Sequence, residues 1–219
     1  MEFQGPLPAD YENVRSLNRA FLQLLQGESG RRYFDRSPQE LLRRLRRLKL
    51  SEIERLSAAP FLLFSFRERD DRFWQELLAD DKGHDLFAVP LRASDESGRL
   101  ISAGLGFVWQ LAHRNPFAAR LLCEASTHWC EQITELTFLD LLAIAGHRSD
   151  LVCIRAKDDG EFWRKLLDTG VCQAKEIRIA AQISAFQYLL TCHSGPVTWE
   201  AAACSSRSPA LRVAEEPKS

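Results

Sequence analysis

The sequence is poor in the features that mark several common protein classes. It contains 11 Gly and 9 Pro in 219 residues, too few for a loop-rich all-β chain. No apolar run reaches the roughly 18 residues that predict a membrane span. The formal net charge is −1, so any attraction to nucleic acid or to an acidic membrane would need a local patch. With 45% hydrophobic and 27% charged residues, the composition instead predicts a soluble chain with a sizeable core.

Motifs for catalysis and metal binding are also missing. The sequence has no G-x-S-x-G, no Gly-rich phosphate loop and no H-E-x-x-H. Cys123, His128 and Cys130 lie near one another, and Cys192 precedes His193, but the paired-ligand spacing C-x₂-C or H-x₃-H does not occur. We therefore expect no enzymatic activity, no metal and no cofactor.

The first half of the chain has no cysteine at all. The six cysteines lie at positions 123, 130, 153, 172, 192 and 204. Most of them, such as Cys153 in LVCIR, lie in apolar stretches, which is typical of reduced, buried thiols. The first residues, MEFQGPLPADYE, lack the basic start and apolar stretch of a signal peptide. We expect a cytoplasmic protein of bacterial type.

One pattern occurs twice. Residues 64–78 (FSFRERDDRFWQELL) align with residues 152–167 (VCIRAKDDGEFWRKLL) at an offset of 88, which places Asp70 on Asp158. One extra residue near Gly160 then brings the FW and LL pairs into alignment. The same offset holds upstream for five apolar positions. These are Leu45, Leu48, Leu50, Ile53 and Leu56, which fall on Ile133, Leu136, Phe138, Leu141 and Ile144.

The repeat predicts a mostly α-helical fold made of two diverged tandem modules, each with a short extended segment. The alternative is a chance resemblance between two amphipathic helical stretches. We expect modules over residues 1–79 and 99–193, a linker over 80–98 and a flexible tail over 194–219. Expected helices are 11–26, 37–48, 51–58, 70–78, 100–112, 116–124, 127–135, 138–146, 160–168 and 173–191, with an extended segment over 61–66.

Local signals support the helix starts. Capping boxes are expected at Ser37 and Ser51. The pairs 70–71 and 158–159 (both Asp-Asp) precede helices, so we interpret them as N-caps rather than as general acid–base carboxylates.

A basic run gives the first module a candidate DNA-binding face. Residues 31–49 contain eight Arg or Lys and two acids. The equivalent stretch of the second module, THWCEQITEL, has no such run. Arginines on a short helix could contact phosphates, although a solvated face of an amphipathic helix is the simpler interpretation. The candidate DNA-binding residues are Arg43, Arg44, Arg46, Arg47 and Lys49.

Aromatic and apolar residues supply candidates for contacts between modules or with a partner. Neighbouring residues on a helix point about 100° apart. One ring of each FW pair is therefore free for such a contact, unless both rings share a broad buried face. The first helix also has more apolar positions than one small module needs. The candidates are Leu17, Phe21, Leu24, Trp74 and Trp163.

These stretches resemble the flagellar transcriptional activator FlhD family. The resemblance includes YENVRSLNRAFLQLL (11–25) and LRRLKLSEIERLSAAPFLLFSFRERDD (45–71) in the first module. In the second it includes NPFAARLLCEAS, ITELTFLDLLAIAGHRSDLVCIRAKDD and AKEIRIAAQISAFQYLL. It covers about residues 11–78 and 102–191, and most matched positions are apolar spacings.

The resemblance implies an all-α, non-enzymatic transcriptional regulator that acts on promoter DNA with a companion subunit, FlhC. That subunit carries a zinc-binding cysteine cluster, which this chain lacks. The family member is a single module that dimerises, so two modules imply a fused pseudo-dimer. We expect regulation, for example of motility genes, through a protein partner (a companion subunit or a homodimer), with weak DNA contact. The alternative is an adaptor, chaperone or anti-activator without DNA binding.

Overall fold

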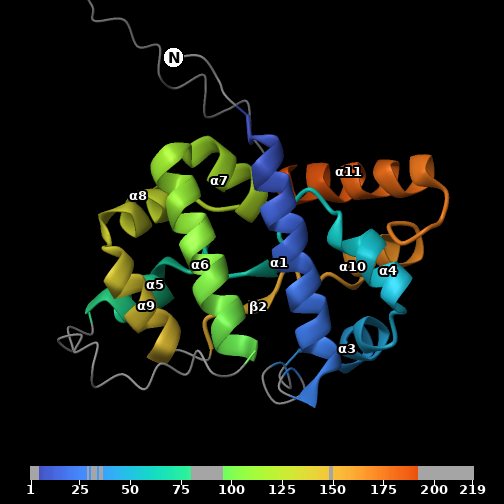
Figure 1. Cartoon of the computed structure of the whole chain (residues 1–219), viewed down its shortest axis with the longest axis horizontal. Helices are drawn as coiled ribbons and strands as arrows, with labels where there is room; N and C mark the ends of the chain where they lie inside the picture. The colour runs from blue at the N-terminus through green and yellow to red at the C-terminus, as the bar shows by residue number, and fades with distance from the viewer. Residues whose placement is uncertain are drawn as a thin grey trace, which may run out of the picture.

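A computed structural model describes residues 5–28, 30, 34, 37–79, 96–147 and 150–191. Within these residues the chain forms ten helices and one pair of two-residue strands (Figure 1). The expected mostly helical class is therefore confirmed. Most of the expected linker (80–98) and the expected tail (194–219) lie outside the described residues.

Each half ends in the same order of elements, helix, helix, strand and helix, and the second half has one more described helix before them. The first half runs α1 (Pro8–Gln26), α3 (Gln39–Arg46), α4 (Leu50–Ser57), β1 (Phe64–Ser65) and α5 (Asp71–Ala79). The second half runs α6 (Glu96–Arg114), α7 (Pro116–Cys123), α8 (Thr127–Glu135), α9 (Phe138–His147), β2 (Cys153–Ile154) and α10 (Gly160–Asp168), followed by α11 (Lys175–Thr191). Below, "first half" means residues 8–79 and "second half" means residues 96–168.

The two long helices α1 and α6 lie side by side and antiparallel (Figure 1). Each has 19 residues. At one end, Arg114 donates to both carboxylate oxygens of Asp10 at 2.6 Å. Besides α6, helix α1 packs on α3 and α4 of its own half. Its apolar face at Val14, Leu17 and Phe21 is buried, as the periodicity predicted.

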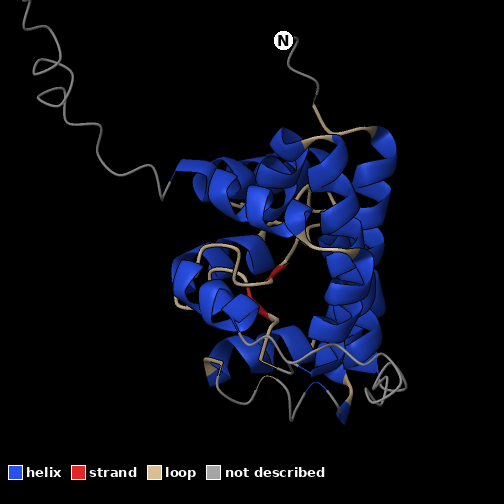
Figure 2. Ribbon diagram, turned by 90° about the vertical axis from the view of Figure 1, so that its left-hand side faces the viewer, coloured by secondary structure: helices blue, strands red, loops and turns tan. Residues whose placement is uncertain are grey.

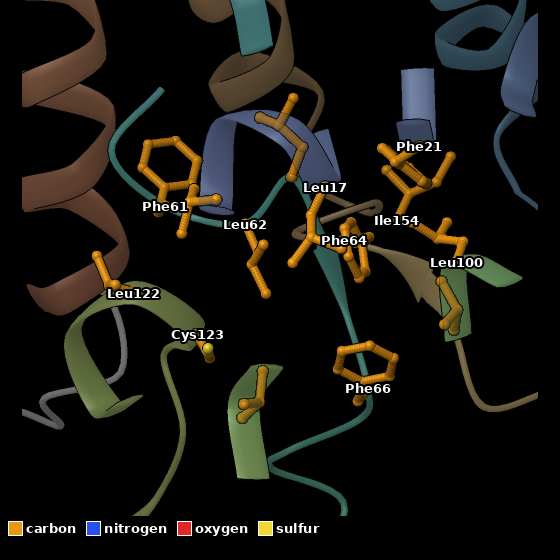
Figure 3. Packing of buried hydrophobic residues seen from close by; sticks show 14 of the residues in the cluster. Leu17, Phe21, Phe61, Leu62, Phe64, Phe66, Leu100, Leu122, Cys123 and Ile154 are labelled. Carbon is orange, nitrogen blue, oxygen red and sulfur yellow. The ribbon is translucent and has the colours of Figure 1, made fainter. Parts of the chain in front are cut away.

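The core is shared by both halves (Figure 3). Phe61, Phe64 and Phe66 of the first half are buried in the same apolar cluster as Leu100 and Leu122 of the second. Figure 2 shows the strand pair near the centre of the helical body. Because burial of apolar area is the main stabilising contribution, we expect the halves to fold as one cooperative unit.

The predicted start signals were right at two helices and wrong at two others. Asp70 and Asp159 cap α5 and α10, as described below. Helix α3 begins at Gln39 without a side-chain cap, so the predicted Ser37 box is wrong. At α4, the Lys49 N–H donates to the Glu52 carboxylate at 2.7 Å, two residues earlier than a box on Ser51 requires. Because α4 begins at Leu50, Ser51 lies inside the helix and cannot be its N-cap, whereas Glu52 bonds back to the N–H of the actual N-cap residue.

Candidate interaction surfaces

The strand pair joins the two halves through equivalent positions. β1 and β2 are antiparallel, with Ser65 opposite Cys153 and Phe64 opposite Ile154. Ser65 and Cys153 are also the positions that the offset of 88 brings together. In a two-fold symmetric interface, a residue on the symmetry axis faces the same residue of the other subunit. Ser65 and Cys153 face each other in this way.

Immediately after the strands, each half makes the same tight turn. Arg67 and Ala156 both have left-handed backbones, with φ of 59° and 45°. The Asp70 N–H donates to the Arg67 carbonyl, and the Asp159 N–H donates to the Ala156 carbonyl. Arg67 and Ala156 are 89 positions apart, so the offset between equivalent residues has increased from 88 to 89 by Ala156. The extra residue lies before this turn and not near Gly160, so the alignment of Asp70 with Asp158 was wrong.

The helix after each turn is capped in the same way. The Asp70 carboxylate accepts from the Phe73 N–H at 3.1 Å, and the Asp159 carboxylate accepts from the Phe162 N–H at 2.8 Å. Burial would raise the pKa of Asp70, but bonds from Phe73 and Arg67 lower it overall. The bond from Phe162, followed by one from the Tyr188 hydroxyl, lowers the pKa of Asp159. The capping interpretation is confirmed in both halves.

The two tryptophans of the FW pairs also make equivalent bonds. The Trp74 indole N–H donates to the Phe66 and Arg67 carbonyls at 3.1 Å, and the Trp163 indole N–H donates to the Arg155 carbonyl at 2.8 Å. Both rings of each pair are buried. Each indole therefore holds its helix against the turn that precedes it.

Aromatic rings also meet across the halves. Trp74 packs edge-on against Trp129 of α8, with ring centroids 5.4 Å apart. In the opposite direction, α10 packs on α3. The ring centroid of Phe162 in α10 lies 6.3 Å from that of Phe61 in the first half. The last helix of each half thus contacts the other half. All five candidate contact residues are buried in the core. They are Leu17, Phe21, Leu24, Trp74 and Trp163.

A buried ion cluster at the junction was not anticipated. Arg155 of the second half is 4% exposed and donates to the carbonyls of Leu62 (2.6 Å) and Phe64 (2.8 Å) in the first. It also donates to Glu68 at 3.2 Å and to Glu124 at 3.0 Å. Burial would lower the pKa of Arg155, but the two carboxylates raise it above its ordinary value. One signal was available, since Arg155 and Glu124 are single charges beside apolar runs.

An open cleft of about 1100 Å³ lies beside this cluster. Both halves line it, with Arg67, Arg69 and Asp70 from the first and Lys157 and Asp158 from the second. All five of these side chains are charged, so this part of the cleft suits polar contacts.

The five basic candidates do not act as one free surface. Arg44 is paired with Asp168 of α10, and the Arg46 side chain donates to the Leu25 carbonyl at 3.3 Å. Arg43 is paired with Glu40 on its own helix. Arg43, together with Arg47 and Lys49, is nevertheless exposed. Two of the five thus also hold α3 against its neighbours.

The described cysteines are free thiols. Burial raises the pKa of Cys123 well above its usual range and that of Cys130 to about 11. Burial, followed by the charge of Glu68, raises the pKa of Cys153. In the part of the chain that the structure covers, no group of three or more potential ligands could hold a metal ion.

No protein-family model, no curated protein and no solved structure matches the chain. Among the described helices, none is both long and apolar enough to cross a membrane.

Proposed function

We propose that this protein is a non-enzymatic, FlhD-like regulator in which the two halves of a dimer are fused in one chain, and that it acts by binding a protein partner. The observation that carries the proposal is the strand junction, where Ser65 faces its own equivalent, Cys153. Separate subunits of a symmetric dimer meet in this way. The equivalent caps, turns and indole bonds on either side extend the relation beyond the strands.

Fusion has a functional consequence. Two identical subunits present identical surfaces, whereas two fused halves can diverge. The second half contributes Arg155 to the buried cluster, and the first contributes the exposed cations Arg43, Arg47 and Lys49. A partner that meets one such half would bind at one site per chain instead of two.

DNA contact is the secondary part of the proposal. Arg44 and Arg46 are engaged within the protein, which leaves Arg43, Arg47 and Lys49 as the cations best placed to reach a phosphate. Each phosphate contact contributes a log–log salt slope of about −0.9. With few contacts and a net charge of −1, the isolated chain should bind DNA weakly.

The test is an electrophoretic mobility shift on a flagellar promoter fragment, with and without a purified FlhC-type subunit. We expect weak binding by the chain alone and a discrete complex when the subunit is present. Exchanging Arg43 and Arg47 for Gln should flatten the salt slope by about two units. A matched control exchanges the exposed Arg72 and Arg164 for Gln, which should leave the slope unchanged.

Two results would count against the proposal. A tight, sequence-specific complex with DNA alone would make the chain an autonomous DNA-binding protein. Failure to bind either the FlhC-type subunit or the promoter would favour an adaptor, chaperone or anti-activator that has kept the architecture without its regulatory partner.

A further inference from the structure

The two halves have equivalent helix–turn–helix corners on their surfaces. The turn between α3 and α4 in the first half corresponds, at the offset of 88, to the turn between α8 and α9 in the second. The same cap follows each turn. The Lys49 N–H donates to the Glu52 carboxylate at 2.7 Å, and the Thr137 N–H donates to the Asp140 carboxylate at 2.9 Å. The two corners therefore share their local architecture.

The corners also expose the same positions, including an apolar one. Each residue over 43–50 has the same degree of burial as its equivalent over 131–138. Leu50 is 67% exposed, and its equivalent, Phe138, is 47% exposed and is followed by Leu139 at 50%. Phe138 reaches the Trp109 ring, with centroids 5.9 Å apart, yet keeps nearly half of its surface in solvent. Large apolar side chains exposed at equivalent turns indicate an interaction surface.

The charge around these apolar residues is reversed between the halves. Residues 40–52 contain five Arg or Lys and two acids, whereas residues 128–140 contain three acids and neither Arg nor Lys. Two exposed arginines one turn apart near the end of α3 have exposed glutamates as their equivalents on α8. They are Arg43 and Arg47, which fall on Glu131 and Glu135. Below, residues 43–50 are the basic corner and residues 131–139 the acidic corner.

The charged side chains of both corners can be reached from solvent. Arg43 is paired with Glu40 on its own helix, and its side chain is still 55% exposed. Within the part of the chain that the structure describes, the side chains of Arg47, Glu131 and Glu135 form no ion pair. An opposite charge brought to either corner would therefore meet charges that are not already neutralised inside the protein.

Charge complementarity favours a second copy of the chain as the occupant. A basic corner with an exposed apolar residue fits an acidic corner of the same architecture, and this chain carries both. Figure 1 shows α3 and α4 on the right of the molecule and α8 and α9 on the left. The two corners of one chain therefore cannot meet each other, whereas those of two copies can.

We propose that copies of the chain associate head to tail, with the basic corner of one copy against the acidic corner of the next. Because the contact joins two different surfaces, each copy keeps one corner open for a further copy. A contact between two corners is smaller than a standard stable interface, so the dissociation constant should lie in the micromolar range. Salt should weaken the association, since it screens exposed charges. This self-association does not depend on the FlhD-like function.

The test is sedimentation velocity of the full chain at low ionic strength, from low to high micromolar concentration. A variant with Arg43→Glu and Arg47→Glu has two acidic corners, and a variant with Glu131→Arg and Glu135→Arg has two basic ones. Each variant alone should associate about tenfold or more weakly than the wild type, because like charges then face each other. An equimolar mixture of the two variants should associate again, since every contact between unlike variants pairs an acidic corner with a basic one.

A matched control makes the same change in net charge away from both corners. Arg72→Glu with Arg164→Glu, at exposed sites on α5 and α10, should leave association unchanged. Because all the substituted sites are exposed, circular dichroism and the melting temperature should stay close to those of the wild type. A wild-type chain that stays monomeric at high micromolar concentration overturns the proposal. So does association that either corner variant leaves intact or that the control abolishes, and so does a mixture that stays monomeric.

Discussion

The two halves of the molecule place an arginine just after the strand, and they use it differently. Arg155 is buried and bonds to backbone and carboxylate oxygens from both halves. Arg67 has a side chain 33% exposed, pairs with Asp70 and lies over the Phe73 ring, with 3.9 Å to the centroid. The caps and indole bonds are the same in both halves. The two halves thus share their local geometry, whereas only the second half supplies an arginine, Arg155, that bonds across to the other half.

The largest expected effect comes from removing the Arg155 side chain. Arg155→Met would leave Glu68 and Glu124 buried without their main cation, which typically costs about 3–5 kcal/mol. Arg67→Met, the same change at the arginine that follows β1, should cost about 1 kcal/mol or less because its ion pair is partly solvated. Urea unfolding measures both. Equal costs would show that the two arginines are interchangeable and would break the comparison.

The indole bonds should be equivalent in the two halves. Trp74→Phe and Trp163→Phe each leave a buried carbonyl without its donor and remove a ring of atoms from the core. Each should destabilise the fold by about 2 kcal/mol. Thermal unfolding monitored by circular dichroism would show it. A cost confined to one half would argue against a common structural role.

Two glycines of α6 test how closely the halves pack. A Cβ on Gly104 would lie 2.5 Å from the Phe66 ring of the first half, so Gly104→Ala should cost about 1–2 kcal/mol. Gly106, two residues further on, has its nearest neighbour at 3.7 Å. Gly106→Ala should therefore stabilise the protein by about 0.5–1 kcal/mol. If both changes stabilise it, α6 does not pack tightly against the first half.

The smallest effects are expected at the caps. Asp70→Ala and Asp159→Ala should each cost about 1 kcal/mol at neutral pH, and Asp158→Ala, next to a cap but without its bond, almost nothing. Since folding lowers the pKa of both caps, their contribution is complete above the unfolded pKa, near 3.8, and disappears as the pH falls through the folded value. Stability measured from pH 7 to pH 2 should fall less steeply in the Ala variants. An unchanged acid profile would mean that the caps do not titrate with folding.

Much of the local structure could be predicted from the sequence, because its causes are local. Apolar periodicity located every helix expected over the described residues to within a few positions, and the acidic pairs located two N-caps. The register at Arg155 could not be predicted in this way. An extra residue can be accommodated anywhere along a loop, and only the backbone shows that it precedes the turn at Ala156.

The roles of side chains were harder to predict than the positions of helices. Nothing local distinguishes Arg44, which reaches Asp168 across 124 residues, from Arg47 at the C-terminal end of the same basic helix. Likewise, the apolar positions of α11 do not reveal which side of the helix faces the body. That side is set by Gln182, a polar residue whose partner, the Arg55 carbonyl, lies in the first half.

Dividing the chain tests the central claim most directly. If residues 1–88 and 89–219 are produced as separate fragments in one cell, we expect them to purify as a 1:1 complex. That complex should have the helical circular dichroism of the intact protein, because each half covers apolar surface of the other. Each fragment produced alone should aggregate or remain largely unfolded. Two fragments that fold independently and do not bind each other would contradict the fused-dimer account.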